Sequence, residues 1–313
     1  MRPLIAITIM LIAQISFGQN YLGYYKQINE AKSLSIDSNY LQSALLYKKT
    51  FEEYDFEFAR DCINAIEISA TLDHNPLTFY FLQCALKRGI PISYFDGKPE
   101  LKNFRLTQYY LSILDSSSIF KKEFDSNINT KIRDEINEMF EDDQQIREHY
   151  YKWWNFPLRP VISEKWKKLN QKQVIRIMEI TKSYGFPGEQ LIGIDFPKYH
   201  EKIDPMQFSA GIPIILFIHH YSQPNFSFDS VLLEEVFKGS LYNEHFATIC
   251  DFEAEFGKNK SDCLGYYGLR HKPKNYVQDK FEDKRKGIGL LLDSEIQRLN
   301  KTQLLTKFWN KLK

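Results

Sequence analysis

The residues that could do chemistry are concentrated in the second half of this 313-residue chain. Asp143 and Arg147 are four residues apart in a stretch with helical periodicity, and His219 and His220 end the most apolar run of the chain outside its N-terminus. A carboxylate, a guanidinium and an imidazole are the groups of general acid–base catalysis, and an imidazole with a carboxylate can also bind a metal ion. Adjacent histidines on a helix point about 100° apart, so only one of the two can face a given site.

Two interpretations of these residues stay open. In the functional one, Asp143, Arg147 and His220 are catalytic, with His245 or Glu253 as further candidates, and the ligand is contacted by Gln144, His219 and Tyr267. In the structural one, Asp143 and Arg147 form an ion pair that fixes how their helix docks, and the histidines are hydrogen-bonded core residues. The chain has no His-Glu-x-x-His, Gly-x-Ser-x-Gly or phosphate-loop motif, so the sequence predicts no metal and no cofactor.

The four cysteines have no Cys-x-x-Cys spacing, which argues against a zinc knuckle or a thioredoxin-type motif. Cys62 and Cys84 are nearly equidistant from a predicted turn, so they can face each other as a disulfide or as two packed thiols. A bridge between Cys250 and Cys263 would close a short loop and add about 3 kcal/mol of stability. The sequence leaves both pairings open.

The N-terminus has the pattern of a secretory signal peptide, residues 1–18. Arg2 precedes the apolar residues 4–15, and small residues stand at Ser16 and Gly18. The apolar run is shorter than the roughly 20 residues of a spanning helix. We therefore expect a secreted or periplasmic protein with no stable membrane insertion after the signal is removed.

Composition limits the partners. The chain is 43% hydrophobic and 26% charged, which is typical of a globular protein. Its 41 Lys and Arg residues are balanced by 40 Asp and Glu residues. Since there is no basic excess to hold a phosphate backbone, we expect no nucleic acid partner.

Residues 19–95 are predicted to form two antiparallel helical hairpins, from four helices at 21–36, 41–54, 59–72 and 76–89. Ile28-Asn29 recurs as Ile63-Asn64 after 35 residues. With two helices per unit, this stretch resembles the tetratricopeptide repeat family, which implies a helical-repeat domain that offers a groove.

The rest of the chain is also predicted to be helical. Residues 96–128 are expected to be a connector, with a short helix at 103–114 and a loop at 115–118. Residues 129–313 are expected to be a second helical domain. Its predicted helices are 130–154, 170–184 with a capping box at Asn170, 211–221, 230–238, 243–256 and a C-terminal amphipathic helix at 292–312. For 211–221 a buried strand is the alternative. The predicted fold is mainly α, with antiparallel repeat-like hairpins packed against a second all-helical domain.

The region from about residue 135 to 271 resembles a bacterial domain family of unknown function. The pattern that carries the resemblance is Asp143-Gln144 with Arg147, then Gly185-Phe186-Pro187, His219-His220 and Tyr267-Gly268. The chain departs from it after Tyr267, where Gly-Leu-Arg-His replaces a Gly-Thr-Gln ending. The resemblance implies an exported helical domain and no particular activity.

Two functions follow as hypotheses. The first is an exported binding or scaffold module for a protein or peptide, since a helical groove and 43 Phe and Tyr residues offer contact surface. The second is an envelope enzyme of the hydrolase type that uses the His, Asp and Arg cluster.

Overall fold

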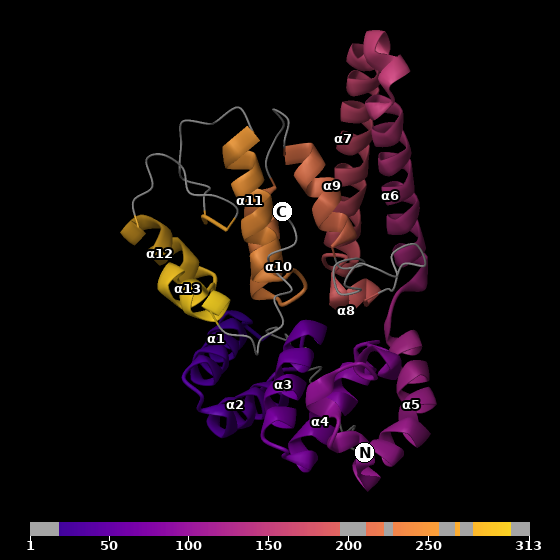
Figure 1. Cartoon of the computed structure of the whole chain (residues 1–313). Helices are drawn as coiled ribbons and strands as arrows, with labels where there is room; N and C mark the ends of the chain where they lie inside the picture. Colours follow the sequence, from indigo (N-terminus) through magenta and orange to yellow (C-terminus); the bar gives the residue numbers. More distant parts are fainter. Residues whose placement is uncertain (1–18, 195–210, 222–227, 257–266, 270–277, 302–313) are drawn as a thin grey trace, which may run out of the picture.

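A computed structural model describes residues 19–194, 211–221, 228–256, 267–269 and 278–301. Every regular element in these residues is a helix, which confirms the predicted mainly α fold. Figure 1 shows the N-terminal helices in one layer and the later helices standing on it. None of the helices in the described ranges is both long and apolar enough to cross a lipid bilayer.

The first four helices form the two predicted hairpins. They are α1 (Leu22–Ile36), α2 (Tyr40–Glu53), α3 (Ala59–Thr71) and α4 (Asn75–Lys87). Local signals set these bounds. For example, the imidazole of His74 accepts a hydrogen bond from the backbone N–H of Leu77 and caps α4.

The predicted connector is largely helical. Three short 3-10 turns, Ile92–Phe95, Pro99–Leu101 and Phe104–Leu106, lead into the 20-residue helix α5 (Gln108–Asn127). The predicted loop at 115–118 is therefore wrong. Ser117 donates its hydroxyl to the carbonyl of Leu114 inside the helix, and the buried Ile113 and Phe120 on either side hold the helix against the core.

Phe124 fixes the position of α5 against two glycines. A Cβ on Gly89, which follows α4, would lie 2.5 Å from the Phe124 ring, and a Cβ on Gly193 would lie 2.6 Å from it. Both glycines have positive φ, +88° and +67°. The ring can approach both turns only because neither has a side chain.

A long hairpin follows, made of α6 (Thr130–Tyr151), the 3-10 turn η4 (Trp153–Leu158) and α7 (Arg159–Tyr184). It extends beyond α9 and α11 at the upper right of Figure 1. The predicted start of the second helix at Asn170 is wrong, because α7 begins 11 residues earlier with Pro160 in its first turn. Asn170 is buried in the helix interior, and Gly185 ends the helix with φ +89°.

The remaining helices are α8 (Glu189–Ile192), α9 (Ile212–Tyr221), α10 (Asp229–Phe237), α11 (Asn243–Phe256), α12 (Gln278–Gly287) and α13 (Asp293–Lys301). The apolar run that ends in two histidines is thus a helix, as predicted, and α9 packs against α6, α7 and α11. Helix α12 was not predicted. The C-terminal helix is described only as far as Lys301.

The N-terminal hairpins and the later helices share one continuous hydrophobic core. The rings of Phe58 and Tyr242 meet edge to face at 4.6 Å between centroids, and the Tyr25 ring lies 5.3 Å from that of Tyr242. The backbone N–H of Tyr21 also donates to the carbonyl of Phe237, at 2.9 Å. The two predicted helical regions are therefore packed as one body.

Three of the cysteines are free. Cys62, Cys84 and Cys250 are buried thiols in the structure, so no bridge joins Cys62 to Cys84. The proposed partner of Cys250, Cys263, lies outside the described residues.

Candidate functional site

Asp143 is the centre of a buried polar network that joins three helices. Its side chain on α6 has no solvent exposure. Trp166 on α7 donates its indole N–H to the carboxylate at 2.7 Å, and the amide nitrogen of Gln144 donates at 2.9 Å. The Nδ1 atom of His219 on α9 lies 3.0 Å from the same carboxylate. A buried charge needs such partners, since its desolvation is costly.

The histidine of this network is His219 rather than His220. His219 keeps 21% of its side chain exposed, and its ring packs edge-on against Trp166 at 5.5 Å. His220 is fully buried on another side of α9, where its ring contacts Tyr221 and Phe228. The structure therefore brings the predicted binding residue His219, and not the predicted catalytic residue His220, to Asp143.

Arg147 reaches the network only indirectly. Its guanidinium is on the exposed side of α6 and donates to the amide oxygen of Gln144 at 3.3 Å. No ion pair joins Arg147 to Asp143, both of which are described, so the expected pairing is replaced by a chain through Gln144. The network thus runs from the surface to the buried carboxylate.

This geometry suits a histidine that works as a base or as a ligand-binding group. A carboxylate accepts hydrogen bonds, so it holds the Nδ1–H of His219 and fixes the tautomer in which Nε2 carries the lone pair. Gln144 and Trp166 hold the carboxylate itself in place. Such outer support fixes the orientation of the imidazole.

The structure does not place Tyr267 and Glu253, two other predicted site residues, in this network. The backbone N–H of Tyr267 donates to Asp251, its carbonyl accepts from Arg285 at 2.6 Å, and its ring packs on Phe246. Burial raises the pKa of its phenol well above the usual range. Residues 267–269 are therefore tied through Tyr267 to Asp251 on α11 and Arg285 on α12, and Glu253 lies on α11.

A second polar cluster, which sequence reasoning missed, lies where the N-terminal helices meet the later ones. Arg60 and Asp61 at the start of α3 are both buried. Tyr24 donates to Asp61 at 3.0 Å, and Arg60 lies 3.2 Å from Glu244. These partners are up to 184 positions apart in the chain, so no local pattern points to them.

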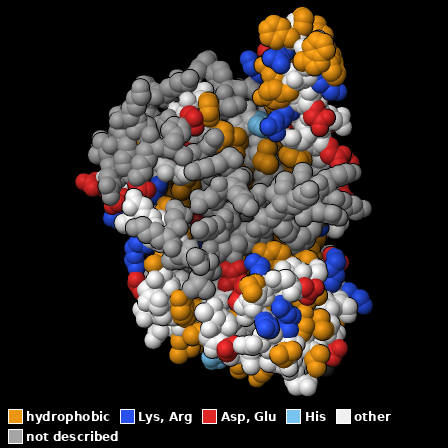
Figure 2. Space-filling view, in the orientation of Figure 1, with side chains coloured by type: hydrophobic (Ala, Val, Ile, Leu, Met, Phe, Trp, Pro, Cys, Tyr) orange, Lys and Arg blue, Asp and Glu red, His pale blue; other side chains and the backbone are white. Residues whose placement is uncertain are grey.

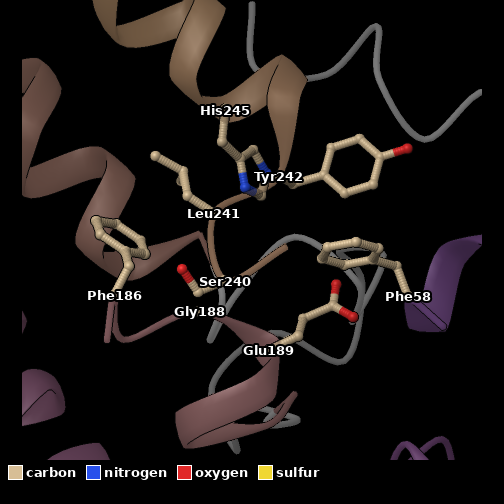
Figure 3. Close-up of a pocket in the computed structure, with 8 residues that line it drawn as sticks. All are labelled: Phe58, Phe186, Gly188, Glu189, Ser240, Leu241, Tyr242 and His245. Atoms are coloured by element: carbon tan, nitrogen blue, oxygen red, sulfur yellow. The ribbon is translucent and has the colours of Figure 1, made fainter. Parts of the chain in front are cut away.

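A small cavity adjoins this cluster (Figure 3). It has room for about one water molecule, with a volume of about 10 Å³. The imidazole of His245 points into it from α11, and Glu189 rises from the start of α8. The Glu189 carboxylate accepts the backbone N–H of Ala59 at 2.9 Å and so caps α3 from a distant part of the chain.

Burial changes the pKa values of Glu189 and His245 in opposite directions. It raises the pKa of Glu189 to about 7, although the Ala59 hydrogen bond and Arg60 oppose the change. It lowers the pKa of His245 to about 3, and the charge of Arg60 lowers it further. Perturbed groups often mark functional sites, but a cavity of one water's size excludes an organic substrate.

The larger opening is a groove between α4 and α5, here called the α4–α5 groove, with a volume of about 480 Å³. Both charged residues that line it, Lys121 and Arg133, are cations. Its other lining residues are mostly apolar: Leu86, Gly89, Ile90, Pro91, Ile92, Ser117, Ser118, Phe124 and Ile194. A volume of this size and a largely apolar wall with few polar groups are typical of ligand sites.

The Asp143 network, the small cavity and the α4–α5 groove all lack the ligands of a metal centre. Among the residues that the structure describes, no three His, Cys, Asp or Glu side chains gather closely enough to hold a metal ion. In comparisons with known proteins, no family model, no curated protein and no solved structure matches the chain. The geometry of its own residues therefore carries the functional argument.

Proposed function

We propose that this chain is an exported bacterial binding module that holds a peptide segment of a protein ligand in the α4–α5 groove. The observation that supports this most directly is the size and chemistry of the groove, about 480 Å³ with apolar walls and two cations. The N-terminal pattern of residues 1–18 supports export to the periplasm or beyond.

The ligand that fits best carries an apolar side chain next to a carboxylate. Phe124, Ile90 and Ile194 would cover the apolar part. Lys121 is paired with Asp125 on the surface of α5, and such an exposed pair contributes little, so its ammonium group can turn to a ligand anion. Arg133 donates a 2.6 Å hydrogen bond to the carbonyl of Ile192, and this bond holds its positive charge in a fixed position at the groove.

A displayed library of random peptides tests this function. Peptides that are selected on the wild-type protein should combine an apolar residue with an acidic residue or a free C-terminal carboxylate. Ser118→Trp fills the groove and should weaken the selected peptides at least tenfold. Ser112→Trp, on an exposed position of the same helix outside the groove, is the matched control. Equal binding by the Ser118→Trp variant would rule out the groove as the site.

A second candidate function, hydrolysis, rests on the contact between His219 and Asp143. In that function His219 would take a proton from water as the water attacks an ester carbonyl, and the proton would pass to the leaving alcohol as the C–O bond breaks. Turnover of simple esters that falls at least a hundredfold in His219→Ala, but not in His149→Ala on the exposed side of α6, would favour it. Equal turnover in both variants would exclude it.

A further inference from the structure

The tip of the α6–α7 hairpin exposes an unusual amount of apolar surface. Six of the 17 large hydrophobic side chains that are exposed in the described residues lie within the eleven residues 151–161. Trp153, the most exposed of the six, has 79% of its surface exposed, and Phe156 has 69%. The others are Tyr151, Trp154, Leu158 and Val161. Exposed apolar patches of this kind mark contact sites, since water contact with them is unfavourable.

The tip is built to hold these side chains outward. Asn155 is the one buried residue of η4, and its amide donates to the carbonyl of His149 at 2.7 Å. The Nε of Arg159 donates to the carbonyl of Tyr150 at 3.2 Å, and its guanidinium lies 5.3 Å from the Phe156 ring centre. These contacts tie the turn to the ends of both helices, so the aromatic residues are presented on a fixed backbone.

Charge is divided along the hairpin. Residues 130–146 hold two basic and six acidic side chains, whereas residues 147–168 hold six basic and two acidic ones. The tip half therefore has a net charge of +4 in a chain whose total is +1. Figure 2 shows hydrophobic side chains gathered at the far end of the hairpin with Lys and Arg side chains at their border.

We propose that this tip docks into the surface of an anionic lipid bilayer, with its aromatic side chains among the headgroups and its basic side chains against the lipid charges. Trp and Tyr prefer the membrane interface, and basic residues beside them bind anionic lipids. A protein partner is the weaker match, because a stable protein interface buries about 1,600 Å² in total and a tip of eleven residues offers little of that.

Binding of the hairpin tip to an anionic lipid bilayer can be tested with vesicles. Residues 19–313 are used, because the apolar residues 1–18 would bind lipid themselves, and the described fold begins at Gln19. The protein should co-sediment with vesicles of phosphatidylglycerol and phosphatidylcholine, and at least tenfold less with phosphatidylcholine alone. Binding should also fall at least tenfold in 0.5 M NaCl, since salt screens the basic residues.

Two variants locate the contact. The triple variant Trp153→Ala, Trp154→Ala, Phe156→Ala should lose at least tenfold in affinity for the anionic vesicles with an unchanged circular dichroism spectrum. The triple variant Leu106→Ala, Leu111→Ala, Ile119→Ala removes similarly exposed apolar side chains elsewhere and should bind as the wild type does.

Other outcomes overturn the proposal. Failure of the wild type to bind either vesicle, or equal binding by the tip variant, excludes the tip as a lipid-binding surface. A wild type that ignores vesicles but sediments as a dimer, and becomes a monomer in the tip variant, assigns the tip to a second copy of this chain.

Discussion

The Nδ1 atom of His219 lies 3.0 Å from the Asp143 carboxylate, which has no contact with solvent and also accepts the Trp166 indole N–H. One buried anion thus links α6, α7 and α9. This contact can be tested by its effect on stability before any ligand is known.

Asp143→Ala should lower the free energy of unfolding by about 2–4 kcal/mol, because three buried or half-buried donors lose their acceptor. Asp143→Asn should cost less, since one carbonyl acceptor remains. Chemical denaturation monitored by circular dichroism measures the change. Asp142→Ala, on the exposed side of the same helix, is the control and should change stability by less than about 0.5 kcal/mol. Equal effects at both positions would contradict the network.

Gly89→Ala and Gly193→Ala should each destabilise the protein by about 1–3 kcal/mol. Each substitution places a methyl group within 2.6 Å of the Phe124 ring and forces a positive φ on alanine. Gly97→Ala is the control, because a Cβ there meets open space. In a Phe124→Ala background the cost of Gly89→Ala should shrink to that of the backbone strain alone. Gly193→Ala should keep a second clash there, because its Cβ would also lie 2.6 Å from the guanidinium of Arg133. A cost that stays the same in that background would show that the ring is not held between the two turns.

In a Cys263→Ser background, no thiol of the folded protein should react with a thiol reagent, and three should react in guanidinium chloride. Cys62, Cys84 and Cys250 are buried, and burial raises the pKa of Cys84 to about 12, so little reactive thiolate is present. Fast labelling of the native protein would contradict their burial. A denatured, unreduced sample that titrates one thiol would show instead that two of the three cysteines are joined in a disulfide.

Local signals in the sequence are enough to predict the helices of the N-terminal part. The breaks after Ile36 and Thr71 coincide with polar turn residues, and the bounds of α1 to α4 differ from the predicted ones by at most two residues. The same reasoning failed for α7. The pattern at Asn170 looks like a helix start, but Ile162, Trp166 and Asn170 continue one stripe backwards at a spacing of four.

That stripe is the signal that would have found Trp166, the donor to Asp143 that the sequence analysis missed. The choice between His219 and His220 could not be made from the sequence, because it depends on the rotation of α9 against α6 and α7. The burial of Arg60 could not be predicted from the sequence either, because its partner Glu244 lies 184 positions later in the chain. Tertiary contacts decide both cases.

Tyr25→Phe should lower the free energy of unfolding by about 1–2 kcal/mol. Its hydroxyl donates to the carbonyls of Val236 and Leu241, at 3.4 and 3.2 Å, across the junction of the N-terminal and later helices. Because the core is continuous, unfolding should remain a single transition that shifts as a whole. Tyr184→Phe, at an exposed position, is the control. Two separate transitions, only one of which shifts, would show that the two parts fold independently.

Glu189→Gln should remove a loss of stability that the wild type shows as pH rises from about 4.5 to 7. The folded protein raises the pKa of this carboxyl from 4.5 to about 7, so it binds more protons than the unfolded chain in that window. Its contribution to stability is therefore complete below pH 4.5 and is lost as pH rises through 7. Glutamine keeps an acceptor for the Ala59 N–H without a charge to desolvate.

The measurement is the difference in free energy of unfolding between Glu189→Gln and wild type at several pH values. This difference should grow from near zero at pH 4.5 to about 1–3 kcal/mol in favour of the variant above pH 7. His245 has the opposite effect on the pH dependence of stability, because its lowered pKa makes the fold less stable as pH falls from 6.5 towards 3. That effect is present in both proteins and largely cancels in the difference. Glu138→Gln, at an exposed position, should give a flat difference, and parallel curves for Glu189→Gln would show that its carboxylate stays charged in the fold.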